Sequence, residues 1–365
     1  MVRFQWDIFC KIVDNFGDIG VCWRLAKQLQ LEHAISVRLW VDDINAAKHL
    51  IPNLNASAMM QTIEGVLIAQ WREDTLFLDA ADVVIEAFGC TLPETYMQQM
   101  HEKTIWVNLE YLSAESWVDN FHGKCSIQNH LRRHFFFPGF TWMTGGLIRE
   151  KSALLHDVEP HQLLQTLLMN EVESLKISLF CYPHAPLIDL LTAFSMSQPA
   201  IMCYVPESSL LSEIAFFFDK TTLQVGDVVN KGQLQLQVLP FLSQNQYDQL
   251  LRTCDINFVR GEDSWVRAIW AGKPFVWQPY LQDESAHLKK LDAFLALYLN
   301  ASKTVRQFHY VWLSSTLSSQ DWSSFVDDLP QIRDLTLQQR NALVNQTDLV
   351  TNLVIFIENL IKTHV

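Results

Sequence analysis

The chain has 365 residues, 49% of them hydrophobic, and a formal net charge of −13 at pH 7. This length accommodates two domains with sizeable cores, and the hydrophobic content excludes an intrinsically disordered chain. The acidic balance argues against a protein that binds duplex nucleic acid, because such proteins neutralise phosphates with clustered Lys and Arg side chains.

Neither membrane insertion nor secretion is indicated by the sequence. No run of 18 or more apolar residues occurs, so we expect no membrane span. The N-terminus carries Asp7 and Lys11 within its first apolar run and lacks the layout of a signal peptide. The seven Cys residues are odd in number and form no CxxC, which favours buried, reduced thiols over disulfides or a zinc site. We therefore expect a cytoplasmic protein with no nucleic-acid or membrane partner.

The first apolar run, residues 6–13, leads into Asp14-Asn15-Phe16-Gly17-Asp18-Ile19-Gly20, and a helical pattern starts at Cys22. This order predicts a strand-to-helix turn with two carboxylates, whose two glycines allow the close approach of a ligand or a positive φ. Ligands of open α/β sheets bind at such turns. Two interpretations stay open. Asp14 and Asp18 are catalytic, or Asp18 only caps the helix and Asp14 only closes the turn.

Apolar strands alternate with helical segments along the remaining chain. In the first half, strands are predicted at residues 36–41, 82–88 and 104–108. Residues 151–174 carry no strand pattern and are interpreted as a linker. The second half has predicted strands at residues 175–180, 200–205, 233–239, 256–259 and 275–277, followed by a helical tail at roughly 331–362. The pattern favours two α/β domains with largely parallel sheets, and a small-ligand site in the cleft between them.

A second polar stretch, Arg260-Gly261-Glu262-Asp263-Ser264, follows the strand predicted at 256–259. It opens a helix that Gly272 is expected to end, with Ser264 as the N-cap. A helix N-terminus together with Arg260 can hold a phosphate group. In the alternative interpretation, Glu262 and Asp263 only complement the helix dipole.

Several common catalytic motifs are missing from the sequence. No GxGxxG follows the first strand, and there is no GxxxxGK[ST], Asp-x-Asp, HExxH or GxSxG. Gln278, Asp283 and Glu284 follow the last predicted strand and could contact sugar hydroxyls, or form a polar loop. Aromatic residues that could stack on a base, or could only pack in the core, recur where strands should end: Phe16, Phe180, Tyr182 and Phe241.

The stretch from Ile8 to Ala26 closely resembles the N-terminal signature of the EarP family, bacterial protein-arginine rhamnosyltransferases that modify elongation factor P. Residues 107–115, 145–150, 259–264 and 271–277 look like further family segments, so the resemblance spans nearly the whole chain.

The resemblance implies a GT-B glycosyltransferase fold, with two Rossmann-like domains facing across a cleft. Residues 1–172 would form the N-terminal acceptor-binding domain, which the C-terminal helix 348–365 would join. Residues 173–347 would form the C-terminal domain that binds the nucleotide sugar.

The resemblance also implies an inverting, metal-independent reaction without a cofactor. Rhamnose would pass from dTDP-β-L-rhamnose to an arginine of elongation factor P, activating that factor for translation of polyproline stretches. Asp14 and Asp18 match the essential acidic pair, with Asp18 as the base, and Glu262 matches an essential glutamate. The implied donor-binding residues are Phe16, Gly17, Phe180, Tyr182, Phe241, Gln244, Arg260, Glu262, Asp263 and Ser264.

The chemistry of arginine fits such a carboxylate pair. A guanidinium group has a pKa above 12 and no lone pair to offer, so the attacking nitrogen needs carboxylates that hold it and accept its proton. Arg260 and the helix N-terminus would stabilise the leaving diphosphate in place of a metal ion. The acidic chain would recognise its acceptor through local basic patches, for which Arg132-Arg133 and Lys48-His49 are candidates.

Two other functions stay open from the sequence. One is a GT-B glycosyltransferase with a different nucleotide-sugar donor, such as a UDP-sugar, and a different acceptor. The other is a non-catalytic nucleotide-binding module, in which Asp14, Asp18 and Glu262 would only cap helices.

Overall fold

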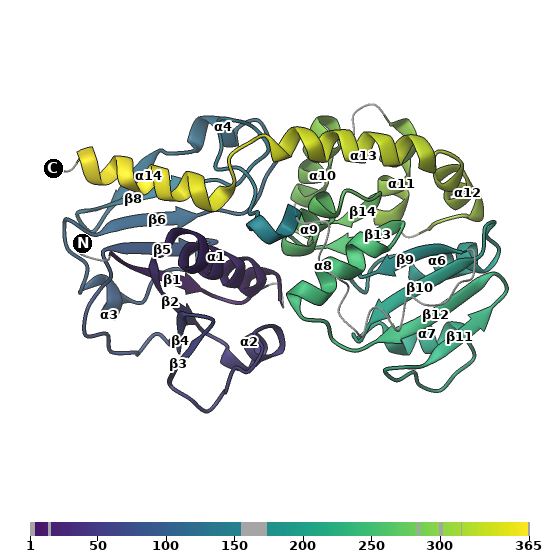
Figure 1. The fold of residues 1–365 in the computed structure, drawn as a ribbon, viewed down its shortest axis with the longest axis horizontal. Coiled ribbons are helices and arrows are strands. Elements are labelled where there is room, and N and C mark those ends of the chain that lie inside the picture. Colours follow the sequence, from purple (N-terminus) through teal and green to yellow (C-terminus); the bar gives the residue numbers. More distant parts are fainter. Residues whose placement is uncertain are drawn as a thin grey trace. The chain divides into compact units, whose positions relative to one another are not determined.

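The computed structural model describes residues 4–13, 16–154, 174–282, 285–298, 302–314 and 316–363. The chain forms two compact units, which we call unit 1 (Met1–Lys151 with Val344–Val365) and unit 2 (Ser152–Leu343). Each unit is a largely parallel sheet with helices packed against it (Figure 1), which confirms the predicted α/β class. The boundary predicted at 172 falls among residues 155–173, outside the described ranges.

Unit 1 contains an eight-stranded sheet of order β3-β4-β2-β1-β5-β6-β8-β7. The pairs β3–β4 and β7–β8 are antiparallel, and the other neighbouring strands are parallel. The strands are β1 Gln5–Cys10, β2 Ser36–Val41, β3 Met60–Ile63, β4 Val66–Gln70, β5 Val83–Ala87, β6 Ile105–Leu109, β7 Cys125–Gln128 and β8 Leu131–Phe136. The helices are α1 Gly17–His33, α2 Ile44–Leu50, α3 Glu94–Met97, α4 Val118–Phe121 and α14 Leu349–Thr363.

Unit 2 contains a six-stranded sheet of order β11-β12-β10-β9-β13-β14, in which only the β11–β12 pair is antiparallel. The strands are β9 Leu175–Leu179, β10 Ile201–Pro206, β11 Val228–Lys231, β12 Leu234–Leu239, β13 Ile256–Arg260 and β14 Phe275–Gln278. The helices are α6 Leu187–Ser195, α7 Leu211–Phe217, α8 Gln244–Thr253, α9 Asp263–Ala271, α10 Ala286–Tyr298, α11 Lys303–Leu313, α12 Ser319–Asp327 and α13 Leu329–Val344, with the short 3-10 helix Lys151–Leu154 at the unit boundary.

All the predicted strands are present, because their apolar runs are buried on both faces of a sheet. Five strands were not predicted from the sequence: β3, β4, β7, β8 and β11. The pairs β3–β4 and β7–β8 are hairpins, and each turn consists of two residues with positive φ. These residues are Glu64-Gly65, with φ of 48° and 81°, and Asn129-His130, with φ of 49° and 65°. Such turns match the twist of an antiparallel pair. Neither Glu-Gly nor Asn-His is among the dipeptides that predict such a turn from sequence.

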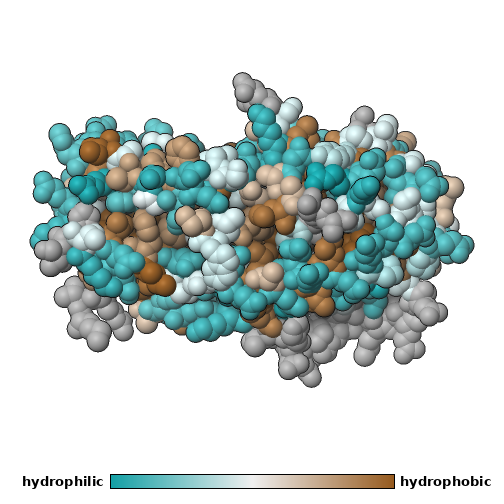
Figure 2. Space-filling model, turned by 90° about the horizontal axis from the view of Figure 1, so that it is seen from above, coloured by the Kyte–Doolittle hydropathy of each residue, from teal (hydrophilic) through white to brown (hydrophobic). Residues whose placement is uncertain are grey.

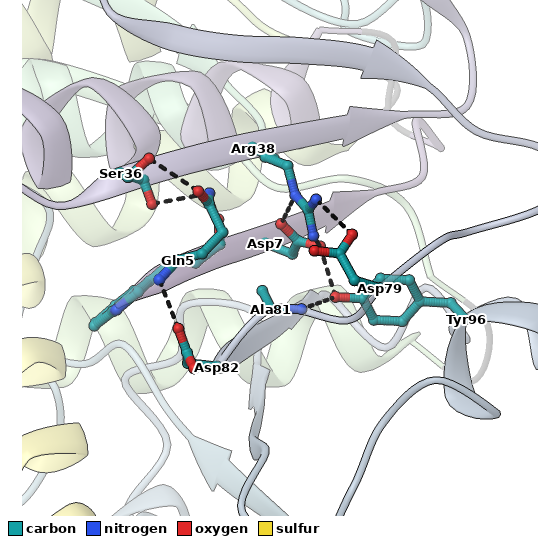
Figure 3. Close-up of polar contacts among 9 residues, drawn as sticks. Gln5, Asp7, Ser36, Arg38, Asp79, Ala81, Asp82 and Tyr96 are labelled. Atoms are coloured by element: carbon teal, nitrogen blue, oxygen red, sulfur yellow. Dashed lines mark hydrogen bonds and ion pairs between the residues drawn. The ribbon is translucent and has the colours of Figure 1, made fainter. Parts of the chain in front are cut away.

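A buried polar network fixes the start of β1 (Figure 3). The carboxylate of Asp7, fully buried, accepts two hydrogen bonds from Arg38 at 2.6 and 2.8 Å and one from the Tyr96 hydroxyl at 2.6 Å. Burial raises the pKa of Asp7, and the bonds from Arg38 and Tyr96 oppose that rise. The Tyr96 hydroxyl also accepts a bond from Ala81 N at 3.1 Å, so the network joins β1, β2 and the approach to β5.

The C-terminal helix α14 packs in unit 1 beside α1 (Figure 1). The backbone between Gly145 and Arg149 receives it. Arg149 donates to the carbonyls of Val344 and Gln346 at 2.9 and 3.0 Å, and Leu349 N donates to Leu147 O at 2.9 Å. Unit 1 is therefore assembled from both ends of the chain.

Hydrophobic side chains also reach the surface of both units. The face drawn in Figure 2 mixes hydrophobic and hydrophilic residues. In unit 1 the exposed large side chains include Trp142 and Met143.

Among the described residues, no helix has the length and apolar character needed to cross a membrane.

Unit 2 is braced at its edge strand β14. The rings of Trp265 and Trp277 stack with centroids 3.7 Å apart. Behind them, Trp277 N donates to His309 Nε2 at 3.1 Å. Nδ1 of His309 therefore carries the proton and donates to Val305 O at 2.8 Å. Burial lowers the pKa of His309 to about 4, so the imidazole is neutral. Because β14 is an edge strand, the backbone N–H of Trp277 bonds to this ring nitrogen.

Replacement of Gly146 by Ala should loosen α14. Gly146 has a φ of +79°, and an added Cβ would lie 2.6 Å from Thr347 O. We expect a loss of about 2–4 kcal/mol in the free energy of unfolding, from the strained φ and the backbone clash together. Gly123→Ala is the matched control, since φ is +76° and the nearest heavy atom lies at 3.6 Å. A loss of the same size in both variants, measured by urea unfolding, would contradict the clash.

His309 should make unit 2 less stable in mild acid. In the unfolded chain His309 has the ordinary histidine pKa of 6.5 and is protonated as pH falls below that value. In the folded protein its pKa is about 4, so it stays neutral until the pH is much lower. This difference should remove about 2 kcal/mol of stability between pH 7 and pH 5. In His309→Gln, whose amide oxygen can still accept from Trp277 N, that part of the loss should disappear. The exposed His101→Gln is the control, and equal pH dependence of wild type and His309→Gln in urea unfolding would refute the assignment.

Candidate active site

The order of strands reverses beside the first strand of each sheet. In unit 1 the chain leaves β1 toward β2 on one side and returns to β5 on the other. In unit 2, β9 has the same position between β10 and β13. Ligands of open α/β sheets bind where the carboxyl ends of such strands diverge. The two predicted polar stretches follow β1 and β13, so each lies at one of these switch points.

The turn after β1 differs from its prediction in one respect. Helix α1 begins at Gly17, so Gly17 and Gly20 are helical residues, and neither has a positive φ. A positive φ, one of the two roles predicted for these glycines, is therefore wrong for both. The N-cap residue is Phe16, whose ring meets that of His49 at 5.9 Å. Asp14 and Asn15 lie outside the described residues.

Asp18 is held by groups from two other segments. Its Oδ2 accepts a hydrogen bond from Val13 N at 2.8 Å, and its Oδ1 accepts one from the Tyr111 hydroxyl at 3.3 Å. The residue is 3% exposed. Asp18 lies within the first turn of α1, whose N-cap residue is Phe16, so Asp18 is not the N-cap of that helix. It is a buried carboxylate with a fixed orientation.

Neighbouring loops add further polar groups at this edge of the sheet. Asp42, after β2, accepts from Ile12 N at 2.9 Å, one residue before the Val13 N that bonds to Asp18. After β6, Glu110 accepts a bond from the Asn108 amide, and the Tyr111 ring stacks on Phe88. The sequence analysis quoted 107–115 as a family segment but singled out neither Glu110 nor Tyr111.

Six of the seven cysteines are buried, in agreement with the predicted reduced thiols. Contact with Cys22 and full burial raise the pKa of Cys10, at the end of β1, well above its usual value. Among the described residues, no cluster of three or more His, Cys, Asp or Glu side chains is arranged to hold a metal ion.

In unit 2, the guanidinium of Arg260 lies between two aromatic rings. Its Cζ is 4.4 Å from the ring centroid of Phe180 and 4.5 Å from that of Tyr182. Cation–π attraction holds the planar group without using its N–H donors. Within the described part of the chain, Arg260 Nε has no hydrogen-bond partner. This guanidinium is therefore fixed in place and able to bind an anion.

Ser264 fastens the turn that carries Arg260. Its hydroxyl accepts from Arg260 N at 3.1 Å and donates to Arg260 O. The prediction that Ser264 is an N-cap is wrong, because α9 starts at Asp263 with Glu262 as N-cap and no side chain caps it. Gly272 ends the helix with a φ of 66°, as predicted. The N-terminus of α9, with its partial positive charge, adds to the anion-binding capacity of the turn.

Gln278, fully buried at the end of β14, connects the strand ends around Arg260. Its side-chain Oε1 accepts from Tyr182 N at 2.7 Å, and its backbone carbonyl accepts from Gly261 N at 3.2 Å. Trp277 Nε1 donates to Gly261 O at 2.8 Å. Gln278 is thus a buried support of the site, while Asp283 and Glu284, named with it in the sequence analysis, lie outside the described residues.

The remaining predicted donor-binding residues lie near the same strand ends. Gln244 is the first residue of α8 and is buried, and Phe241 is half-buried between β12 and that helix. Tyr247, in the next turn of α8, meets the ring of Phe180 at 5.8 Å. The sequence analysis missed Tyr247 because nothing in its local pattern separates it from an ordinary helix residue.

The two polar stretches suit different chemistry. Unit 1 offers a buried, oriented carboxylate that can hold a cationic group and accept a proton. Unit 2 offers a fixed guanidinium, a helix N-terminus and aromatic faces, a set that suits a diphosphate joined to a base.

Comparison with known proteins gives a family and close relatives. The family model described as "Elongation-Factor P (EF-P) rhamnosyltransferase EarP" matches residues 6–358. A protein-arginine rhamnosyltransferase of Pseudomonas putida is 43% identical over 375 residues, covering 98% of this chain and 100% of the relative. One from Pseudomonas aeruginosa is 40% identical over 369 residues, covering 96% and 98%.

Solved structures agree with this relationship. An EarP structure, from work on EarP-mediated arginine glycosylation of translation elongation factor EF-P, superposes with a TM-score of 0.69 at 32% identity, covering 98% of this chain and 99% of the other. The spinosyn rhamnosyltransferase SpnG, complexed with thymidine diphosphate, gives a TM-score of 0.56 at 11% identity, covering 97% and 100%, which is a likeness of fold alone. These neighbours confirm the predicted GT-B fold.

Proposed function

The chain belongs to the EarP family, and from this premise we propose that it transfers rhamnose from dTDP-β-L-rhamnose to an arginine side chain of elongation factor P. The relatives named above are protein-arginine rhamnosyltransferases, which supports a glycosyltransferase activity. The observation that carries the proposal is Asp18, a buried carboxylate with both oxygens engaged, at the switch point of unit 1.

Asp18 is suited to activate an arginine. A carboxylate can accept about four hydrogen bonds. Asp18 can therefore receive N–H groups of an acceptor guanidinium in addition to the bonds from Val13 and Tyr111. As the attacking nitrogen bonds to C1 of the sugar, its proton passes to the Asp18 carboxylate. Asp14 would help hold the guanidinium, as the family resemblance implies.

Unit 2 serves the donor in the proposed reaction. Arg260, held between Phe180 and Tyr182, and the N-terminus of α9 neutralise the charge that develops on the leaving diphosphate. These groups supply the stabilisation that a metal ion gives in other transferases, so the reaction is metal-independent and needs no cofactor. The acceptor nitrogen and the diphosphate lie on opposite faces of the sugar, and the configuration at C1 inverts.

The other donor-site residues have supporting roles in this proposal. Ser264 fixes the turn of Arg260, and Glu262 and Asp263 stand at the start of α9, where Glu262 can shape the donor loop or contact the sugar. Phe16 and Gly17 lie beside Asp18 on the turn of unit 1. The aromatic residue Phe241 and the amide of Gln244 would meet the nucleotide.

Acceptor recognition is better assigned to Lys48-His49 than to Arg132-Arg133. Arg133 pairs with the buried Glu86 at 2.9 Å, and its side chain is 20% exposed, so its charge is already used inside unit 1. His49 meets Phe16 on the turn that carries Asp18.

A modified elongation factor P would then support translation of polyproline stretches, and we therefore propose that the reaction takes place in the cytoplasm.

Substitution of Asp18 tests the reaction. Wild-type protein, dTDP-rhamnose and purified elongation factor P should give a deoxyhexose mass on one arginine by mass spectrometry. Asp18→Asn should lower the transfer rate by about 10²–10⁴-fold, because the proton acceptor is lost. Calorimetric binding of dTDP should be unchanged.

Ser318→Ala is the control, because Ser318 caps α12, a helix that carries no predicted site residue, through a bond from Asp321 N at 3.2 Å. It should cost about 1 kcal/mol of stability and leave transfer intact. Absence of a deoxyhexose on arginine with wild type would refute the proposed function. If Asp18→Asn transferred rhamnose at the wild-type rate, Asp18 would not be the base.

Arg260→Lys tests the donor site. Lysine keeps the charge but loses the planar group that lies between two rings, so we expect dTDP affinity to fall by about tenfold or more in calorimetry. Arg333→Lys is the control, since Arg333 forms an exposed ion pair with Asp255 in the same unit. Equal dTDP affinity of Arg260→Lys and wild type would contradict the role of Arg260.

A further inference from the structure

The ends of β5 and β6 hold a pair of stacked rings above the turn of Asp18. The rings of Phe88 and Tyr111 lie with centroids 4.6 Å apart and planes inclined by 17°. Phe88 adopts a φ of 57°, a conformation that L residues with a bulky side chain rarely take. Its N–H donates to Leu109 O at 2.7 Å. The backbone at the end of β5 thus has an unusual conformation and is bonded to the end of β6, which sets the position from which the Phe88 ring stacks on Tyr111.

The stack places the Tyr111 hydroxyl on Asp18. Tyr111 is 93 residues from Asp18 in the chain, and its Oη lies 3.3 Å from Oδ1. This separation exceeds the usual 2.5–3.0 Å for O–H···O, and bonds in a catalytic site often tighten only when the substrate is bound. Val13 N occupies the other oxygen at 2.8 Å.

Two donors on two different oxygens fix the rotation of a carboxylate about its Cβ–Cγ bond. With Tyr111 in place, the remaining lone-pair directions of the carboxylate have set orientations. Proton transfer from an incoming nitrogen depends on such orientation, since a misplacement of about 1 Å can cost about 10²-fold in rate.

We propose that Tyr111, held by Phe88, is a positioning residue that aims the Asp18 carboxylate at the acceptor nitrogen. The inference rests on the proposed function, in which Asp18 is the base. It assigns to the pair a specific step, the capture of the arginine proton, and does not require Tyr111 to touch the sugar or the nucleotide.

The test compares Tyr111→Phe with a matched variant. Phenylalanine keeps the ring that stacks on Phe88 and removes only the hydroxyl. With elongation factor P and dTDP-rhamnose as substrates, kcat should fall about tenfold while both KM values stay within about twofold. Tyr96→Phe removes the same kind of bond, from a tyrosine hydroxyl to the buried carboxylate of Asp7. It should lower the unfolding midpoint and leave kcat unchanged.

Phe88 is tested through a double substitution. Phe88→Leu removes the stack, so kcat should fall in the wild-type background. In the Tyr111→Phe background the same change should cause no further loss, because the hydroxyl that the stack positions is already absent. Phe88→Tyr keeps the ring and should retain activity.

The outcomes separate the inference from the proposed function. No arginine rhamnosylation by wild type would refute the function itself. Transfer by wild type with an equal kcat for Tyr111→Phe would overturn the inference and leave the function standing. A rise in the KM for elongation factor P at unchanged kcat would also overturn it, by making Tyr111 an acceptor contact. If Phe88→Leu lowered kcat equally in the wild-type and Tyr111→Phe backgrounds, Phe88 would have no role in positioning Tyr111.

Discussion

The reversal of strand order beside β1 and β9 is the constraint on which the rest of the structure depends. At each reversal the connections leave the central strands in opposite directions, so the carboxyl ends of two neighbouring strands are open to a ligand. The side chains that can do chemistry gather there because the buried strands fix their positions. In unit 1 the adjacent strand ends are those of β1 and β5, and in unit 2 those of β9 and β13.

The same architecture is given opposite charge in the two units. Unit 1 presents a buried carboxylate, and its bonds come from backbone and from a tyrosine hydroxyl. Unit 2 presents a guanidinium that aromatic faces hold. In both, the orienting contacts leave hydrogen-bonding capacity for a substrate. Such preorganisation is what the proposed metal-independent transfer requires, because the protein must stabilise each developing charge with groups already in place.

The fold could be predicted from the sequence where burial dictates composition. The central parallel strands show as continuous apolar runs because both of their faces are covered. Edge hairpins such as that turning at Glu64-Gly65 were missed, since they are short and half-exposed. Local rules also failed at the site. Ser264 fits an N-cap by sequence but bonds backward to Arg260, and Gly17 and Gly20 are helical. Tyr111 could not be found by spacing, because strand pairing alone brings it to Asp18.

The return of α14 to unit 1 has a consequence for how the protein is made. A ribosome releases the segment of Asp18 early, yet the last helix of that unit emerges only after the whole of unit 2. During synthesis, the surface that receives α14 is exposed while unit 2 folds as a domain of its own. The contacts of the segment Gly145 to Arg149 with the C-terminal residues, such as the bond from Leu349 N to Leu147 O, can form only after α14 has been made. The unit that carries Asp18 can therefore be completed only after unit 2 has been synthesised.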